Sequence, residues 1–203
     1  MKSIEPARDR GSTARSVVIT YTPNARMDNQ ELKAEADLLI ERVGLAELLT
    51  SYSRWFIGGS YSYDLICWRD LDVYVLEPQH DLKRCFDVGY EVTQRLAAKK
   101  ARFTNNLGGE PNGFYWGIKL GDDRQGAWKL DLWFLGEADY ERHLNYSAEM
   151  RRRLTAETRL AILGIKEVYW RRREYRDTIT GDLIYRAVLN HGVRSVTEFE
   201  RFL

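Results

Sequence analysis

Three aspartates and a glycine-rich turn are the residues of this sequence whose types and spacing could do chemistry. One residue separates Asp70 from Asp72, and Asp131 follows much later in a similar apolar setting. Side chains two apart on a strand share a face, about 6.6 Å apart along the chain. Carboxylates that converge repel one another unless a cation lies between them. Three such oxygen ligands suit Mg²⁺, whose remaining positions are often completed by substrate phosphates.

The turn Gly58-Gly59-Ser60 precedes the aspartate pair by about ten residues. Glycine lets backbone N–H groups approach an anion, and a following helix N-terminus would add positive potential. The Ser60 hydroxyl can donate a further hydrogen bond to a phosphate oxygen. The sequence therefore predicts a phosphate-binding turn ahead of a divalent-cation site.

Strands and helices must position these residues, and the hydrophobic pattern predicts where they lie. Asp28 and Glu31 have the spacing of a helix-capping box. Apolar runs and alternation predict strands at 55–57, 69–76, 114–120 and 127–134, the last two forming a hairpin. Helical spacing predicts helices at 29–51, 61–68, 81–102, 155–176, 182–191 and 197–202, with helical pattern from 139 onward.

This order predicts an α+β fold, with a small mixed sheet flanked by helices and then a helical C-terminal region. We expect a leader with a short extended segment at 1–28, a main domain at 29–138 and the helical region at 139–203. The extended segment is the apolar run at 16–22. The loop at 105–113 is rich in glycine and asparagine and is a candidate cover for the site.

Composition narrows the class of protein. The net charge is +1 over 203 residues, which argues against a polyanion-coating protein. Residues 1–148 carry a net −3, and residues 149–203 carry +4. No apolar run is long enough for a membrane span, and the two cysteines lack disulfide or metal spacing. We therefore expect a cytoplasmic protein without a membrane partner.

The motifs together resemble the DNA polymerase β-type nucleotidyltransferase superfamily, and most of all its minimal, antibiotic-modifying members. That pattern is a hydrophobic residue, Gly, then Gly or Ser, a gap of about ten residues, two aspartates flanking a hydrophobic residue, and a third carboxylate on a later strand. The matching pieces here are Ile57-Gly58-Gly59, Asp70-Leu71-Asp72-Val73 and Leu130-Asp131-Leu132.

The resemblance implies a polymerase β-like fold, a nucleoside triphosphate and two Mg²⁺ ions. Asp70, Asp72 and Asp131 would be the catalytic metal ligands, with Asp131 also orienting or deprotonating an acceptor hydroxyl. Gly58, Gly59 and Ser60 would bind the nucleotide phosphates. The acceptor would be a small molecule or a protein, with nucleic acid disfavoured by the near-neutral charge.

Several residues allow more than one interpretation. Lys129 shares a face with Asp131 and could contact a phosphate, balance the ligand charge or form a surface pair. Arg69 is equally a nucleotide contact or a surface residue. Trp133, Tyr61 and Tyr63 could stack on a base or belong to the core. The protein as a whole also has two alternative interpretations: a non-catalytic, antitoxin-like nucleotide-binding or regulatory module of the same fold, and an RNA-extending enzyme.

Overall fold

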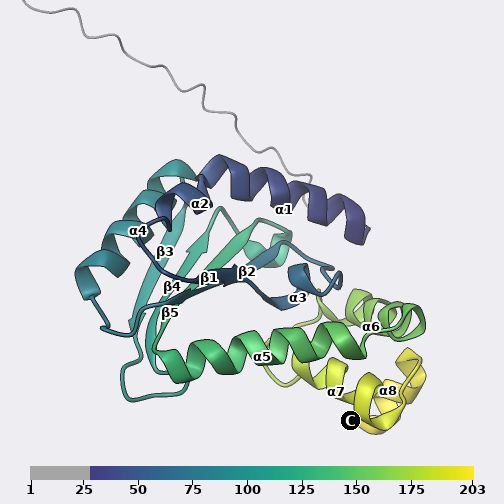
Figure 1. Ribbon diagram of the computed structural model, residues 1–203. Helices are drawn as coiled ribbons and strands as arrows, with labels where there is room; N and C mark the ends of the chain where they lie inside the picture. The colour runs from purple at the N-terminus through teal and green to yellow at the C-terminus, as the bar shows by residue number, and fades with distance from the viewer. Residues whose placement is uncertain (1–27) are drawn as a thin grey trace, which may run out of the picture.

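The computed structural model describes residues 28–203. The leader and the extended segment predicted at 16–22 lie outside the described residues. Within the described part, a mixed five-stranded sheet carries helices on both faces, as Figure 1 shows. The predicted α+β class with a small mixed sheet is confirmed.

The sheet has the strand order β1-β2-β5-β4-β3. The central strands β2 and β5 are parallel, and the other neighbouring pairs are antiparallel, including the predicted hairpin of β4 and β5. The strands are β1 Trp55–Ile57, β2 Asp70–Leu76, β3 Lys100–Asn105, β4 Gly113–Lys119 and β5 Lys129–Leu135.

One face of the sheet forms the main hydrophobic core. Leu71, Val73 and Val75 alternate along β2 toward this core, as alternate positions of β5 also do. Three helices cover that face in Figure 1: α1 Asn29–Val43, α2 Leu45–Leu48 and α4 Leu82–Arg95. Alternation therefore leaves the side chains of Asp70 and Asp72 on the opposite face.

The opposite face is covered by the C-terminal helices. Tyr140 of α5 packs on Leu76 and Leu135, at the ends of the two central strands. A separate apolar cluster joins the last three helices to the segment at 63–68. The four C-terminal helices are α5 Glu137–Arg153, α6 Ala156–Tyr169, α7 Gly181–His191 and α8 Val196–Phe202. The division into domains at 139 stays a prediction, since α5 packs on the sheet and leads directly to α6.

The segment before β2 is held by the C-terminal region. Tyr63, Leu65 and Trp68 are buried among the C-terminal helices. Lys166 of α6 donates to the Leu65 carbonyl at 2.6 Å, and Arg159 donates to the Tyr63 carbonyl. These contacts fix the chain that connects the glycine turn to Asp70.

Several predicted helices are shorter than their apolar patterns. The helix at 29–51 is interrupted at Gly44, whose φ of +63° ends α1. The helix at 61–68 is replaced by α3, the four residues Gly59–Ser62. The helix at 155–176 ends at Tyr169. The capping box of Asp28 and Glu31 is confirmed by reciprocal hydrogen bonds.

The helix predicted at 81–102 is wrong beyond Arg95. Ala97 has a φ of +48°, which breaks the helix, and residues 100–105 form the edge strand β3 instead. The backbone groups of this segment form their hydrogen bonds with β4 instead of within a helix, and helical periodicity in the sequence does not reveal that pairing. Among the described helices, none has both the length and the apolarity to cross a membrane.

Candidate active site

The register of the two central strands brings the predicted aspartates together. In the parallel pair, Asp72 lies beside Asp131, and Asp70 lies beside Lys129. All four side chains occupy the face opposite the main core. The N–H of Gly58, just after β1, donates to the Asp72 carbonyl at 2.9 Å. The glycine turn and the aspartate pair are therefore adjacent.

Gly59 is required by its close approach to Asp72. Its φ is +59°, and a Cβ built at this position would overlap the Asp72 carboxylate. The turn is thus shaped around that side chain. The helix that follows, α3, has only four residues, so the helix N-terminal potential expected from the sequence is largely missing.

A cavity of about 660 Å³ opens between these residues and the C-terminal helices. The turn contributes Gly59 and Ser60, and the sheet contributes Asp70, Asp72 and Lys129. The C-terminal wall includes Arg142, His143, Lys166, Arg176, Asp182 and Tyr185. The cavity therefore has carboxylates on the sheet side and mostly cationic and aromatic side chains on the other.

Burial makes the aspartate pair reluctant to ionise. Burial is the main cause that raises the pKa of Asp70 to about 6, against the attraction of Lys129 and with the repulsion of Asp131. Burial, followed by the charges of Asp70 and Asp131, holds the pKa of Asp72 well above its ordinary value. A divalent cation beside the pair would favour the ionised forms.

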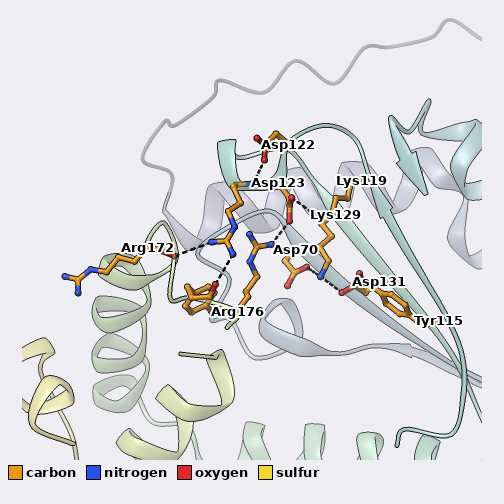
Figure 2. Close-up of polar contacts among 11 residues, drawn as sticks. Asp70, Tyr115, Lys119, Asp122, Asp123, Lys129, Asp131, Arg172 and Arg176 are labelled. Atoms are coloured by element: carbon orange, nitrogen blue, oxygen red, sulfur yellow. Dashed lines mark hydrogen bonds and ion pairs between the residues drawn. The ribbon is translucent and has the colours of Figure 1, made fainter. Parts of the chain in front are cut away.

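Asp131 is fully engaged by two neighbours, as Figure 2 shows for the ammonium. The Tyr115 hydroxyl donates to Oδ1 at 2.7 Å, and the Lys129 ammonium donates to Oδ2. Gly117 lies opposite Asp131 on β4, and its missing side chain leaves room for the Tyr115 hydroxyl. Asp131 is 7% exposed and does not line the cavity.

Lys129 lies between two of the carboxylates. Its Nζ is 3.6 Å from Asp70 Oδ1, longer than a hydrogen bond, and is paired with Asp131 Oδ2. Burial lowers the pKa of Lys129, but attraction by Asp70 and Asp131 outweighs this and raises it. The side chain therefore carries a full positive charge at neutral pH.

The carboxylates of the candidate site fit the expected magnesium only in part. Asp70 and Asp72 fit one ion, because Asp70 Oδ1 is buried without a hydrogen-bond partner and both carboxyls border the cavity. Asp131 is the poorer ligand in this arrangement, because each of its oxygens accepts a hydrogen bond and the Lys129 ammonium already neutralises its charge. Consistently, no three Asp, Glu, His or Cys side chains among residues 28–203 stand arranged to hold a metal.

Arg69 is placed away from the cavity. Its Nε and Nη2 donate to Glu35 of α1 at 2.6 and 2.9 Å, and Nη1 donates to the Gly126 carbonyl at 3.0 Å. The residue is 4% exposed and lies on the core side of the sheet. The Arg69 guanidinium therefore points away from this cavity, and a nucleotide contact for Arg69 stays a prediction.

The three aromatic residues singled out in the sequence are separated by the fold. Tyr63 lines the cavity. Trp133 packs against Tyr115, with ring centroids 4.4 Å apart, and Tyr61 donates to Asp37 on α1. Only Tyr63 of the three is therefore available to a molecule in the cavity.

Sequence reasoning missed several residues of the site. Lys166 lies on the otherwise apolar, buried face of α6 and is 1% exposed. A charged residue within a buried helical face is a readable signal for such a role. Arg176 and Tyr115 carry no comparable signal, because a turn and a strand pairing bring them to the site.

Comparisons with known proteins give similarity of structure alone. A scan of family models finds no match, and no curated protein matches the sequence. Solved structures of Cid1 poly(U) polymerase do match. One with Mg and 3'-dATP bound has a TM-score of 0.55 at 18% identity, covering 82% of this chain and 51% of that chain.

Two further Cid1 structures agree. The complex with MgATP has a TM-score of 0.56 at 17% identity, again covering 82% of this chain and 51% of the other. A structure described as a basis for RNA terminal uridylyl transferase activity has 0.54 at 19%, with 82% and 50% covered. This chain spans about half the length of the solved structures it matches. The resemblance read from the motifs is confirmed at the level of architecture: the chain has the DNA polymerase β-type nucleotidyltransferase fold.

Proposed function

We propose that the protein is a Mg²⁺-dependent nucleotidyltransferase, which moves a nucleoside monophosphate from a nucleoside triphosphate to an acceptor hydroxyl and releases pyrophosphate. One observation carries the proposal. Two buried carboxylates, Asp70 and Asp72, face a cavity beside the Gly59-Ser60 turn in a fold shared with nucleotide-bound transferases.

The chain's own residues would act mainly by positioning and by balancing charge. Asp70 and Asp72 would hold the metal, which supplies charge neutralisation on the phosphates when bound. Backbone N–H groups of Gly58 and Gly59 and the Ser60 hydroxyl would contact the phosphates. Lys166 lies across the cavity as a buried cation and would attract the same charge.

Asp131 would complete the site once its partners release it. With the Lys129 ammonium displaced, its carboxylate could hold the second of two expected ions, or accept a proton from the acceptor hydroxyl. Lys129, which borders the cavity, would then be available to a phosphate. Two ions and a direct role for Asp131 both depend on that displacement.

The acceptor is proposed as a small molecule or a protein hydroxyl. The near-neutral charge supports this, but the solved neighbours are described as poly(U) polymerase and RNA terminal uridylyl transferase. RNA therefore belongs in the same screen, and RNA extension would overturn the acceptor prediction while leaving the reaction type intact.

A labelled-triphosphate screen tests the proposal. The protein is incubated with Mg²⁺ and each of the four α-³²P-labelled triphosphates, against pooled small molecules, RNA oligonucleotides and the protein alone. Label transferred to one acceptor together with pyrophosphate release is the expected result. Neither product, from any acceptor class, would contradict the proposed activity.

A second candidate function is favoured by the engagement of Asp131. A non-catalytic nucleotide-binding module would tolerate a third carboxylate permanently paired with Lys129 and Tyr115. Calorimetry with triphosphate, with and without Mg²⁺, separates the two candidates. Tight binding without pyrophosphate release over long incubation would favour the module.

A further inference from the structure

Lys129 occupies the space between two carboxylates that the fold would otherwise share with a metal ion. Its ammonium contacts Asp131 and stands 3.6 Å from Asp70. It is also 5.8 Å from the centre of the Trp68 ring, which is 6% exposed. A positive charge therefore already lies inside the candidate metal centre.

The geometry of the strands fixes this placement. Lys129 is the direct neighbour of Asp70 in the parallel pair and lies two residues before Asp131 on the same face of β5. Its side chain is 18% exposed, and those of Asp70 and Asp131 are 16% and 9% exposed. Little water is left to screen the ammonium from either carboxylate.

The position of the charge suggests competition with a metal. A divalent ion that bridged Asp70 and Asp131 would have to occupy the region of the ammonium, and two cations that close repel strongly in a buried site. The other part of the centre is open, because Asp70 and Asp72 both border the cavity. The carboxylates therefore differ: Asp70 and Asp72 still open onto the cavity, although Asp70 lies 3.6 Å from the ammonium, whereas Asp131 is paired with it directly.

We propose that Lys129 is a built-in cation that holds the place of the second metal ion, so that the free protein binds one divalent ion and admits another only when the ammonium leaves Asp131. This inference rests on the proposed function for its first ion. It makes Lys129 a gate on the metal content of the site, in addition to any contact with phosphate.

Counting bound Mn²⁺ tests the gate without any measurement of activity. Free Mn²⁺ is followed by its electron paramagnetic resonance signal during titration of wild type, Lys129→Met and Lys129→Gln, without nucleotide. Wild type is expected to bind one Mn²⁺ per chain. Each variant is expected to bind two, with the added site at least tenfold tighter than any second site of wild type.

Two different substitutions of Lys129 allow an effect on metal binding to be distinguished from misfolding. Lys129→Met leaves the carboxylates without their cation, whereas Lys129→Gln keeps an N–H donor for Asp131 while removing the charge. Lys119→Met is the matched control, because Lys119 neighbours Lys129 across β4 and β5 but pairs with Asp123 instead. This control should bind the same number of ions as wild type.

The double variant Lys129→Met with Asp131→Asn removes both the gate and its carboxylate. It should return to one Mn²⁺ per chain, since the second ion would lose its ligand. An equal count in wild type and both single variants would overturn the inference, as would two ions of similar affinity in wild type. The count is independent of pyrophosphate release, so failure of the proposed activity would be recognised separately.

Discussion

Two acid–base clusters lie close together in Figure 2, and their charges are balanced in opposite ways. In the first, a single carboxylate, Asp123, accepts from Lys119 at 2.8 Å and also from Arg176. In the second, one ammonium, Lys129, is paired with Asp131 and lies 3.6 Å from Asp70, and Asp72 is the third carboxylate. The first cluster has excess positive charge, and the second has excess negative charge.

The proton affinities of the carboxylates follow that balance. Burial opposes ionisation of Asp123, but hydrogen bonds from Lys119 and Arg176 outweigh it and lower its pKa. Burial raises the pKa of Asp70 and of Asp72, and the attraction of Lys129 and the more distant Lys166 does not compensate. The first arrangement stabilises the folded state, whereas the second leaves buried charge that a ligand could neutralise.

The first cluster also has a mechanical role. Arg176 follows α6, and the short helix that begins at Asp123 connects β4 to β5. Arg124 donates to the carbonyls of Arg172 and Tyr175, both at 3.3 Å. Together these contacts join the sheet to the C-terminal region at one side of the cavity. The first cluster, which we call the clamp, therefore holds two parts of the fold together, whereas the second has the charge of a binding site.

The largest expected effect is the loss of activity when one aspartate of the second cluster is replaced by an uncharged residue. Asp72→Asn should lower nucleotidyl transfer by about 10³-fold or more, because it removes a metal ligand where charge develops. The same change should raise the melting temperature by a few degrees, since it relieves buried repulsion. Transfer assays and thermal melts measure the two effects. Unchanged transfer would rule out the proposed mechanism.

The next largest effect is expected from a substitution in the glycine turn that surrounds the Asp72 carboxylate. Gly59→Ala places a Cβ against the Asp72 carboxylate at a positive φ, so we expect about 10- to 100-fold lower transfer with the fold retained. Gly108→Ala is a matched control for the positive φ alone, because nothing lies within 4 Å of its Cβ position. Equal activity of the two variants would contradict the role given to Gly59.

The clamp should respond in the opposite sense. Asp123→Asn leaves Lys119 and Arg176 without their carboxylate and should destabilise the protein by about 1–2 kcal/mol. Chemical denaturation measures the loss, and the Mn²⁺ count should stay at the wild-type value. A stabilised Asp123→Asn variant would show that the two clusters do not differ as described.

An effect of similar size is expected in the dependence of stability on pH. The pKa of Asp70 is about 6 in the folded state and about 4 when unfolded, so the folded state binds more protons between these values. Its contribution to the unfolding free energy is therefore present at pH 4 and is lost as the pH rises to 6. Asp70→Asn should gain ~1–3 kcal/mol over wild type across that window.

Asp123 supplies the contrast in the same experiment. Its lowered pKa means that its contribution is present above about pH 4 and is lost as the pH falls further. The stability difference between wild type and Asp123→Asn should shrink below pH 4, measured by denaturation. Parallel pH profiles for the two variants would contradict the comparison.

The sequence predicted the arrangement of the three aspartates better than it predicted where the helices and strands begin and end. Strand alternation placed Asp70, Asp72 and Asp131 on one face, and the parallel register confirms that arrangement. Helical periodicity predicts a helix that continues past Arg95. The residues at 100–105 instead form β3, because they pair with β4, and a local pattern does not reveal that pairing. Long-range pairing of this kind is not encoded in a short window.

Long-range pairing also explains why the contacts of Lys129 and Arg69 could not be predicted from the sequence. Alternation along β5 predicts that Lys129 lies on the same face as Asp131, but its approach to Asp70 depends on the register of β2 against β5. Arg69 was given a possible phosphate contact because it precedes Asp70. Its guanidinium instead pairs with Glu35 on the other side of the sheet, a partner 34 residues away.

The helix α5 has a consequence for how the cavity could be tuned. It begins beside the end of β5, crosses the sheet under β2 and ends next to α6, as Figure 1 shows. Its 17 residues span roughly 25 Å, so a tilt of one degree at Gly136 moves the far end by about 0.4 Å. Arg142 and His143 of α5 line the cavity. Substitutions near Gly136 could therefore change the size of the cavity while Asp70 and Asp72 stay where β2 holds them.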